Sequence, residues 1–205
     1  MAVTGHFSYR SYKVSYLIRC ETSLPTMTKA FDAFERAIRD AEQLLARYDA
    51  EKSASNGHNG EVLKRAGLVM ALAAWETYVK DRIHSEIDTW LQAVDGSPIG
   101  KFVRRRLEED LKRFFNPNSE RTRRIFIEYF DTDITKDWVW DNYDSSTSKK
   151  ALDALIAKRG DAAHKANTAA HSSAEPHKVK REELEKGIRF LKGLVAATEK
   201  AKITK

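Results

Sequence analysis

Arg159 and His164 are the residues whose types and spacing best fit chemistry on a phosphodiester. Arginine is a permanent planar cation that suits phosphate, and histidine is the side chain that exchanges protons near neutral pH. Both lie in residues 152–164, where an apolar helical run is followed by Arg159, Gly160, Asp161, two alanines and His164. Side by side, the two side chains would suit the cleavage of RNA by acid–base chemistry.

The spacing of Arg159 and His164 leaves several interpretations open. Five residues along a regular helix turn about 500°, so the two positions would face about 140° apart. Their side chains converge only if the helix is irregular, for which Gly160 offers a weak point, or if a second copy of the chain completes the site. The plain alternative is an exposed arginine and a histidine that caps a helix or lies in the core.

Length and composition bound the class of protein. A chain of 205 residues with 32% charged and 41% hydrophobic residues is typical of one soluble globular domain. Its single cysteine, Cys20, excludes an internal disulfide framework and fits a reducing cytosol, and the scattered histidines form no zinc pattern. No signal-peptide pattern opens the chain, and the longest mostly apolar run, residues 66–75, is too short to cross a bilayer. We therefore expect a cytoplasmic protein with no membrane partner, metal or cofactor.

Apolar residues recur at helical spacing along most of the chain, which predicts an all-α bundle of about five to six helices. The expected helices span residues 23–49, 61–94, 98–115, 120–130, 179–201, and a segment that leads from a cap at residues 145–148 to Arg159. A solvated loop containing His58 is expected at residues 53–60, and an irregular segment at residues 131–146. The side chains expected to face the core around these segments include Phe102, Leu107, Leu111, Phe114, Trp138, Trp140 and Tyr143.

Glu76 and Lys80 share a face of the long central helix. In this order and at this spacing they predict a surface ion pair that stabilises by roughly a few tenths of a kcal/mol. Because these charges interrupt the most apolar helix of the chain, a functional site is the alternative.

The basic residues suggest where an acidic partner would bind. A net charge of +6 favours such a partner, for example nucleic acid. Residues 104–106 are three arginines that precede three acidic residues by four positions, which favours a solvated, salt-bridged face. Arg121, Arg123 and Arg124 have fewer acidic neighbours and, with Lys165, are the candidates for contact with RNA phosphates.

Residues 1–22 are aromatic and basic and are expected to form an extension outside the helical domain of residues 23–205. An arm that packs on the domain or on a partner subunit is the favoured interpretation. Stacking of its aromatic side chains on bases is the alternative.

Three features together resemble the HEPN superfamily, small helical bundles found in toxin–antitoxin, abortive-infection and CRISPR-associated ribonucleases. Residues 159–164, late in an all-helical chain, resemble its Arg-x(4–6)-His motif, and residues 76–80 resemble its Glu-x3-Lys/Arg pattern. Residues 182–192 are similar to the last helix of stand-alone bacterial members of the RiboL-PSP and related types. The likeness covers roughly residues 26–200.

The resemblance implies metal-independent cleavage of RNA by its 2′-hydroxyl, leaving 2′,3′-cyclic phosphate and 5′-hydroxyl ends. His164 would be the general base or acid, Arg159 would hold the phosphate, and Glu76 and Lys80 would orient the pair. The site would lie at the interface of a homodimer in a toxin–antitoxin or antiphage defence system. An antitoxin or a protein of a defence complex would be a further partner.

Gly160 departs from the superfamily pattern, because many members carry a polar residue directly after the arginine. Asp161 would have to take that role from one position further on. The departure supports an alternative, a non-catalytic HEPN-like module that binds nucleic acid or nucleotide or scaffolds a defence complex. Such a module predicts salt-dependent RNA binding without cleavage. A helical bundle that serves only as a partner subunit is the third hypothesis.

Overall fold

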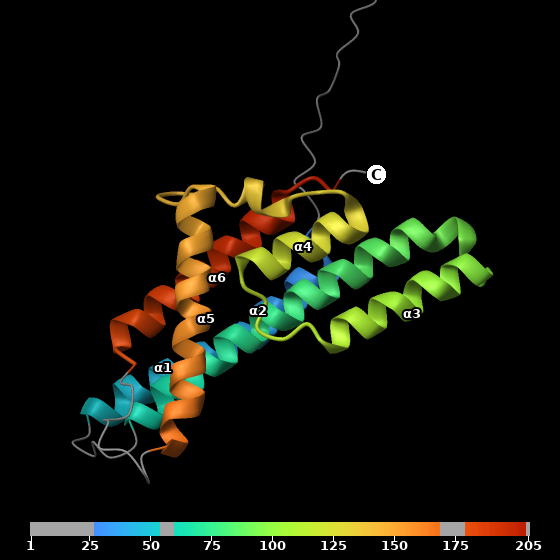
Figure 1. The fold of residues 1–205 in the computed structure, drawn as a ribbon. Coiled ribbons are helices and arrows are strands. Elements are labelled where there is room, and N and C mark those ends of the chain that lie inside the picture. Colours follow the sequence, from blue (N-terminus) through green and yellow to red (C-terminus); the bar gives the residue numbers. More distant parts are fainter. Residues whose placement is uncertain (1–26, 54–59, 169–178, 204–205) are drawn as a thin grey trace, which may run out of the picture.

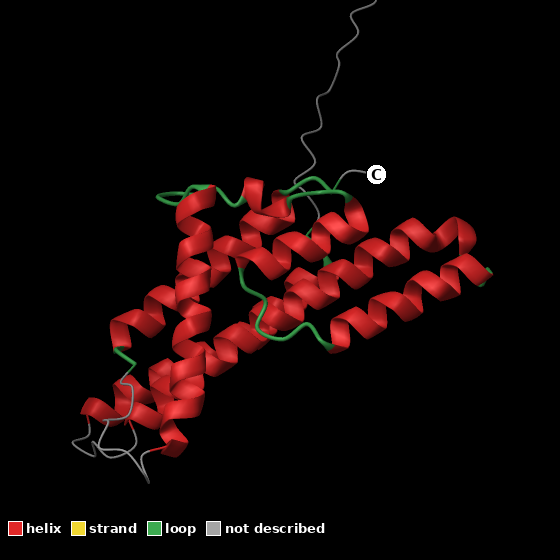
Figure 2. Ribbon diagram, viewed as in Figure 1, coloured by secondary structure: helices red, strands yellow, loops and turns green. Residues whose placement is uncertain are grey.

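The computed structural model describes residues 27–53, 60–168 and 179–203, with the backbone alone described for residues 161–168. Within these ranges the chain forms six α-helices and two short 3₁₀ turns (Figures 1 and 2). They are α1 (Lys29–Ser53), α2 (Gly60–Leu91), η1 (Gln92–Val94), α3 (Pro98–Lys112), α4 (Ser119–Phe130), η2 (Ile134–Asp137), α5 (Ser145–Thr168) and α6 (Arg181–Lys200). The expected all-α bundle of five to six helices is confirmed. None of the helices in the described ranges is long and apolar enough to cross a membrane.

Helix α2 is the axis of the bundle, and α1 packs along it more extensively than any other helix does. Both helices present apolar stripes at three- and four-residue steps, which meet in one core. Helix α5 crosses the N-terminal half of α2, and α3 runs beside its C-terminal half (Figure 1). Helix α6 packs along α2 as far as Tyr78 and Arg82. The core side chains of α2 are Leu68, Ala71, Leu72, Ala74, Trp75, Tyr78, Val79, Ile83, Ile87 and Leu91.

Helix α3 corrects one expectation about the core. Leu107 and Leu111 are buried as expected, but Phe102 is 64% exposed. The reason is register: Val103, one position later, lies in the same stripe as Leu107 and Leu111 and packs against the core. Phe102 is rotated by about 100° from that stripe and faces outward.

The arginine triplet at residues 104–106 meets acidic partners, though not only the expected ones. Arg106 Nε lies 3.1 Å from Asp110 Oδ2, four residues on, as the spacing predicts. Arg104 instead binds Asp88 of α2 and Asp95 of the turn before α3. The pair with Asp88 connects α3 to the last part of α2, and the pair with Asp95 connects α3 to the turn that precedes it.

The segment between α4 and α5 packs tryptophan side chains onto the core, as expected. Trp138 is fully buried, with its ring centroid 6.0 Å from that of Trp75 in an edge-on arrangement. Trp140 stacks on Tyr143 at 4.8 Å, and both rings contact Phe190 of α6.

The cap of α5 is Asp144, and not the serine- and threonine-rich run at residues 145–148. Asp144 Oδ1 accepts a hydrogen bond of 2.7 Å from the backbone N–H of Thr147. The Thr147 hydroxyl in turn accepts one of 2.9 Å from the backbone N–H of Asp144. A carboxylate satisfies the free N–H groups of a first turn and also favours the positive end of the helix dipole.

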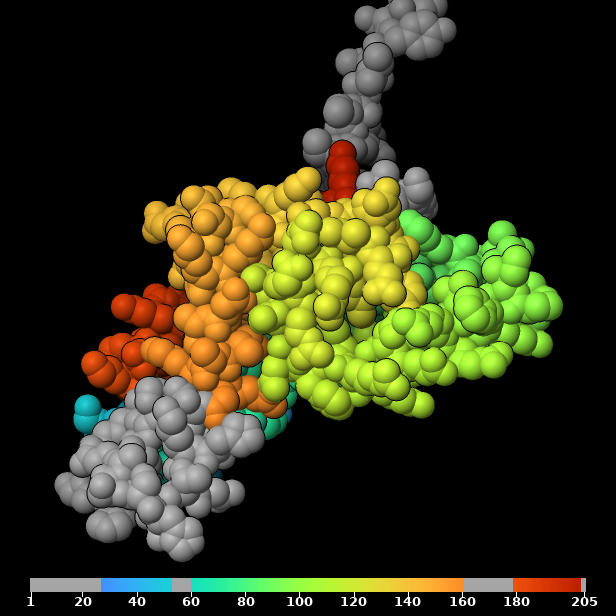
Figure 3. Space-filling model, in the orientation of Figure 1, coloured from blue at the N-terminus to red at the C-terminus, as the bar shows by residue number. Residues whose placement is uncertain are grey.

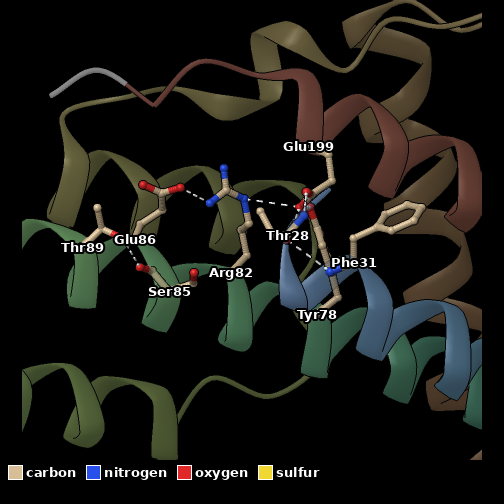
Figure 4. Close-up of polar contacts among 8 residues, drawn as sticks. All are labelled: Thr28, Phe31, Tyr78, Arg82, Ser85, Glu86, Thr89 and Glu199. Atoms are coloured by element: carbon tan, nitrogen blue, oxygen red, sulfur yellow. Dashed lines mark hydrogen bonds and ion pairs between the residues drawn. The ribbon is translucent and has the colours of Figure 1, made fainter. Parts of the chain in front are cut away.

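A buried polar network joins the start of α1, the middle of α2 and the end of α6 (Figure 4). The Glu199 carboxylate of α6 accepts hydrogen bonds from the Tyr78 hydroxyl at 2.8 Å and from the Thr28 backbone N–H at 3.0 Å. Arg82 Nε lies 3.4 Å from the same carboxylate, and the other end of its guanidinium binds Glu86. The side chains of Glu199 and Arg82 are only 3% and 7% exposed, so removal of either charge would leave the other buried without this partner.

Candidate functional site

Helix α5 carries both residues of the Arg-x4-His motif, and its backbone is helical without interruption from Ser145 to Thr168. Gly160 therefore does not break the helix, so an irregular helix does not bring positions 159 and 164 together. Positions 159 and 164 lie about 140° apart around a single regular helix. One chain cannot direct both positions to the same side of α5.

Arg159 lies on the side of α5 that faces the bundle. It follows Leu152, Leu155 and Ile156 at steps of seven, four and three residues, and these three side chains pack on the core. Arg159 is half-buried, and within the described residues its guanidinium forms no hydrogen bond or ion pair. The neighbouring Lys158, by contrast, binds Glu183 of α6 at 2.8 Å. The guanidinium of Arg159 is thus available to an anion.

Position 164 follows Asp153, Ala157 and Gly160 along one stripe of α5, at steps of three and four residues. Ala157 is exposed, and a Cβ atom added to Gly160 would meet no neighbour within 4 Å. The side chains of Asp161, His164 and Lys165 lie outside the described residues.

The first half of α5 is held firmly against the rest of the bundle. Both oxygens of Asp153 accept hydrogen bonds of 2.8 Å from Ser119, one from its backbone N–H and one from its hydroxyl. The Ser148 hydroxyl donates to the Trp138 carbonyl at 3.0 Å. With the Lys158–Glu183 pair, these contacts position the motif-bearing part of α5 relative to α4 and α6.

Glu76 and Lys80 form the predicted ion pair, with Nζ 2.8 Å from Oε1. The second oxygen of Glu76 accepts a 2.9 Å hydrogen bond from the backbone N–H of Asn116, in the loop between α3 and α4. Lys80 Nζ lies 5.2 Å from the ring centroid of Phe115. Within the part of the chain that the structure describes, neither residue forms a hydrogen bond or an ion pair with Arg159. The structure therefore brings Glu76 and Lys80 together with this loop.

The three arginines expected to bind RNA differ in their surroundings. Arg121 donates to the carbonyls of Phe115 and Arg113 at 2.6 and 3.0 Å. Arg123 donates to Asp133 at 3.0 Å. Arg124 is exposed and forms no hydrogen bond or ion pair with any described residue. Of the three, Arg124 is thus the one whose guanidinium lies ready for an external phosphate.

Hydrogen bonds determine the charge state of Asp133, the partner of Arg123. Burial works to raise the pKa of Asp133, but hydrogen bonds from Thr135 and Arg123 together lower the pKa below its ordinary value. The Asp133 carboxylate also accepts from the Thr135 backbone and so caps η2. Among the described side chains, no three His, Cys, Asp or Glu groups are placed to hold a metal ion.

Comparison with known proteins agrees with this architecture, a helical bundle with Glu-x3-Lys on its central helix and Arg-x4-His on a late one. A family model described as RiboL-PSP-HEPN matches residues 35–201. The chain therefore belongs to the RiboL-PSP-HEPN family, as the motifs predicted. The matched region runs from within α1 to the end of α6. No curated protein and no solved structure matches the chain.

Sequence reasoning missed two groups of residues that the structure makes prominent. Arg82 occupies a position in the apolar stripe of α2, between Tyr78 and Ile83, and this position was a signal for a buried charge. Phe115 was expected to end the helix of residues 98–115, which instead ends at Lys112, and Asn116 was expected in a turn. Their contacts with Lys80 and Glu76 had no local signal.

Proposed function

We propose that this protein is a metal-independent endoribonuclease of a toxin–antitoxin or antiphage defence system. Membership of the RiboL-PSP-HEPN family supports an RNA-related module. The observation that carries the proposal is the state of Arg159: it stands in the family motif, is half-buried, and has no carboxylate partner within the described residues. A partly desolvated arginine without a counter-ion is suited to hold a phosphate and the charge that develops on it.

The reaction needs one base, one acid and one anion-binding group. His164 removes the proton from the 2′-hydroxyl, and the resulting oxygen attacks the adjacent phosphorus while the bond to the 5′-oxygen breaks. The 5′-oxygen leaves with a proton from an acid, and a 2′,3′-cyclic phosphate remains. Arg159 donates hydrogen bonds to the phosphate oxygens as their charge rises. Histidine suits the proton transfers because its ordinary pKa is about 6.5.

A homodimer supplies the geometry that a single α5 helix lacks. Because positions 159 and 164 diverge by about 140° on one helix, we propose that each site takes Arg159 from one protomer and His164 from its partner. Asp161 orients the pair, in the place of the polar residue that follows the arginine in many members of the superfamily. An antitoxin or a defence-complex protein is a further proposed partner.

The first test is cleavage of a mixed RNA pool in EDTA, with the product ends identified. We expect cyclic phosphate ends from the wild type and no cleavage by His164→Ala or Arg159→Ala. The matched controls are His84→Ala, a part-exposed histidine of α2, and Arg105→Ala, an exposed arginine of α3. Both controls should cleave like the wild type. Cleavage by either site variant would contradict the assignment.

Mixing the two inactive variants tests the shared site directly. In a heterodimer of Arg159→Ala with His164→Ala, one of the two composite sites keeps both residues. After subunit exchange, the mixture should recover about a quarter of wild-type activity, since half of the dimers are mixed and each has one intact site. No recovery in a mixture shown to contain heterodimers would place both residues of each site in one protomer. No cleavage by folded wild-type dimers would instead favour a module that binds RNA without cutting it.

A further inference from the structure

The loop at residues 113–118, between α3 and α4, presents an aromatic side chain to solvent from a tightly held backbone. Trp75 Nε1 donates to the Pro117 carbonyl at 2.9 Å, and Glu76 accepts from the Asn116 N–H at 2.9 Å. Arg121 holds the carbonyl of Phe115 at 2.6 Å. Three side chains from α2 and α4 thus hold the loop in place.

Phe115 gains little packing from this support, because it remains 56% exposed. A large apolar side chain left in water on a rigid loop is prepared to contact a partner at low entropic cost. The Lys80 ammonium, 5.2 Å from its ring centroid, adds a cation beside the aromatic surface. Aromatic rings combined with cations are the usual means of holding unpaired bases and their phosphates.

A hollow of about 200 Å³ lies between α3 and α4 beside this loop, and arginines line it. The guanidinium groups of Arg113 and Arg124 are exposed and form no hydrogen bond or ion pair with a described residue. Of the two acidic residues that also line it, Asp110 is already engaged by the Tyr129 hydroxyl at 2.7 Å and by Arg106. Glu128 is the other. The cations at this hollow therefore outnumber the uncommitted carboxylates.

We propose that Phe115, Arg113 and Arg124 form the surface that binds single-stranded RNA. Phe115 stacks on an unpaired base, and the two arginines hold neighbouring phosphates. The inference rests on the proposed function, because it takes RNA as the ligand, and it deepens that function by naming the strand form and the residues that bind it.

The position of this surface relative to α5 suits that role. Ser119, which begins α4 directly after the loop, is hydrogen-bonded to Asp153 of α5. Asp153 precedes Arg159 by six residues, a rise of about 9 Å along the helix. Helices α3, α4 and α5 form one continuous face of the molecule (Figure 3). A strand bound at this face would thus lie close to α5, the helix that carries the motif.

The test is the affinity for a single-stranded 2′-O-methyl oligonucleotide, which lacks the attacking hydroxyl and so reports binding without cleavage. Phe115→Ala should raise the Kd by about fivefold to a hundredfold, as for the loss of one stacked base. Phe115→Trp should keep the affinity. The matched control is Phe102→Ala, since Phe102 is a similarly exposed phenylalanine on α3, at 64%, and its loss should not change the affinity. Circular dichroism confirms that each variant is folded.

Arg124→Ala should weaken binding and lower the slope of log K against log salt by about 0.7, because one phosphate contact is lost. Arg105→Ala, an exposed arginine on α3, is its control and should leave the slope unchanged. A duplex of the same sequence should bind more weakly than the single strand and should be insensitive to Phe115→Ala.

The outcomes separate this inference from the proposed function. If wild-type protein cleaves RNA but Phe115→Ala binds the oligonucleotide as tightly as Phe102→Ala does, the inference is overturned and the ribonuclease assignment stands. If the wild type binds no single strand, the inference is overturned as well. If binding depends on Phe115 and Arg124 but no RNA is cut, the inference stands and the proposed catalysis fails.

Discussion

Glu76 and Asn116 are joined by a hydrogen bond of 2.9 Å between the carboxylate Oε2 and the backbone N–H, although 40 positions separate them in the chain. Asn116 has a φ of 49°, in the left-handed region that asparagine tolerates better than most residues. The carboxylate of Glu76 thus supports an unfavourable backbone conformation while it also binds Lys80. Glu76 therefore has a structural role in the α3–α4 loop, whether or not it also acts in cleavage.

Replacing Glu76 should reveal its structural role. Glu76→Ala should lower the free energy of unfolding by about 1–2 kcal/mol, since it leaves a backbone N–H and the Lys80 ammonium without their partner. Glu76→Gln should cost less, because an amide oxygen still accepts from Asn116. Urea unfolding measures both, with Glu109→Ala, an exposed carboxylate of α3, as the control. Equal stability of Glu76→Ala and wild type would contradict the structural role.

Glu199 should be far more sensitive than a surface carboxylate. Glu199→Ala leaves Arg82 buried with Glu86 alone and removes the acceptor of Tyr78, so we expect a loss of about 3–5 kcal/mol. Glu51→Ala breaks a partly exposed pair with Arg47 on α1 and should change the free energy by less than about 1 kcal/mol. Urea denaturation of both variants is the measurement, and similar losses in the two would contradict the prediction.

Tyr78 should contribute a pH dependence in the alkaline range. Burial, together with the nearby Glu199 charge and the hydrogen bond to it, raises the pKa of Tyr78 well above its ordinary value. Its contribution to stability is therefore fully present below about pH 10 and is lost as the pH rises from there towards the folded-state pKa. Tyr78→Phe lacks this titration. The stability difference between wild type and Tyr78→Phe should shrink above about pH 10, and a constant difference would count against it.

Gly160 and Gly67 should respond in opposite ways to alanine. A Cβ atom at Gly160 meets nothing within 4 Å in a regular part of α5, so Gly160→Ala should stabilise the protein by about 0.5–1 kcal/mol. A Cβ atom at Gly67 would lie 2.8 Å from Leu184 Cδ2, so Gly67→Ala should destabilise it through the α2–α6 contact. Thermal unfolding measures both, and a lower Tm for Gly160→Ala would argue against a regular helix there.

Arg123 should contribute to the stability of the protein, whereas the neighbouring Arg124 should not. Arg123→Ala removes the ion pair with Asp133, so the pKa of Asp133 should rise and the protein should lose about 0.5–1 kcal/mol near neutral pH. Because the native pKa of Asp133 is depressed, this stability is present above about pH 4 and is lost as the pH falls through the folded-state pKa. Arg124→Ala should leave both quantities unchanged. NMR titration of the Asp133 carboxyl carbon, alongside unfolding, is the measurement.

Features that depend on residues close together in the chain were predictable from the sequence. The helices follow from apolar residues at three- and four-residue steps, a signal that each segment carries by itself. The pair of Glu76 with Lys80 and that of Arg106 with Asp110 follow from the same spacing, because residues four apart are neighbours on any helix. The family motifs of α2 and α5 are equally local, and they identified the superfamily.

Only the tertiary structure decided which side chains are buried, which are paired and which are exposed without a partner. Phe102 and Val103 are adjacent in an amphipathic segment, and the packing of α3 on α2 determined which of them faces the core. The acceptor of Tyr78 lies 121 residues away, and the loop supported by Glu76 lies 40 residues away, so no spacing rule could pair them. Helix α5 also continues through Gly160, although glycine has a low helix propensity. Local spacing thus determined the elements, whereas contacts between distant segments determined the surroundings of Arg159, Glu76 and Phe115.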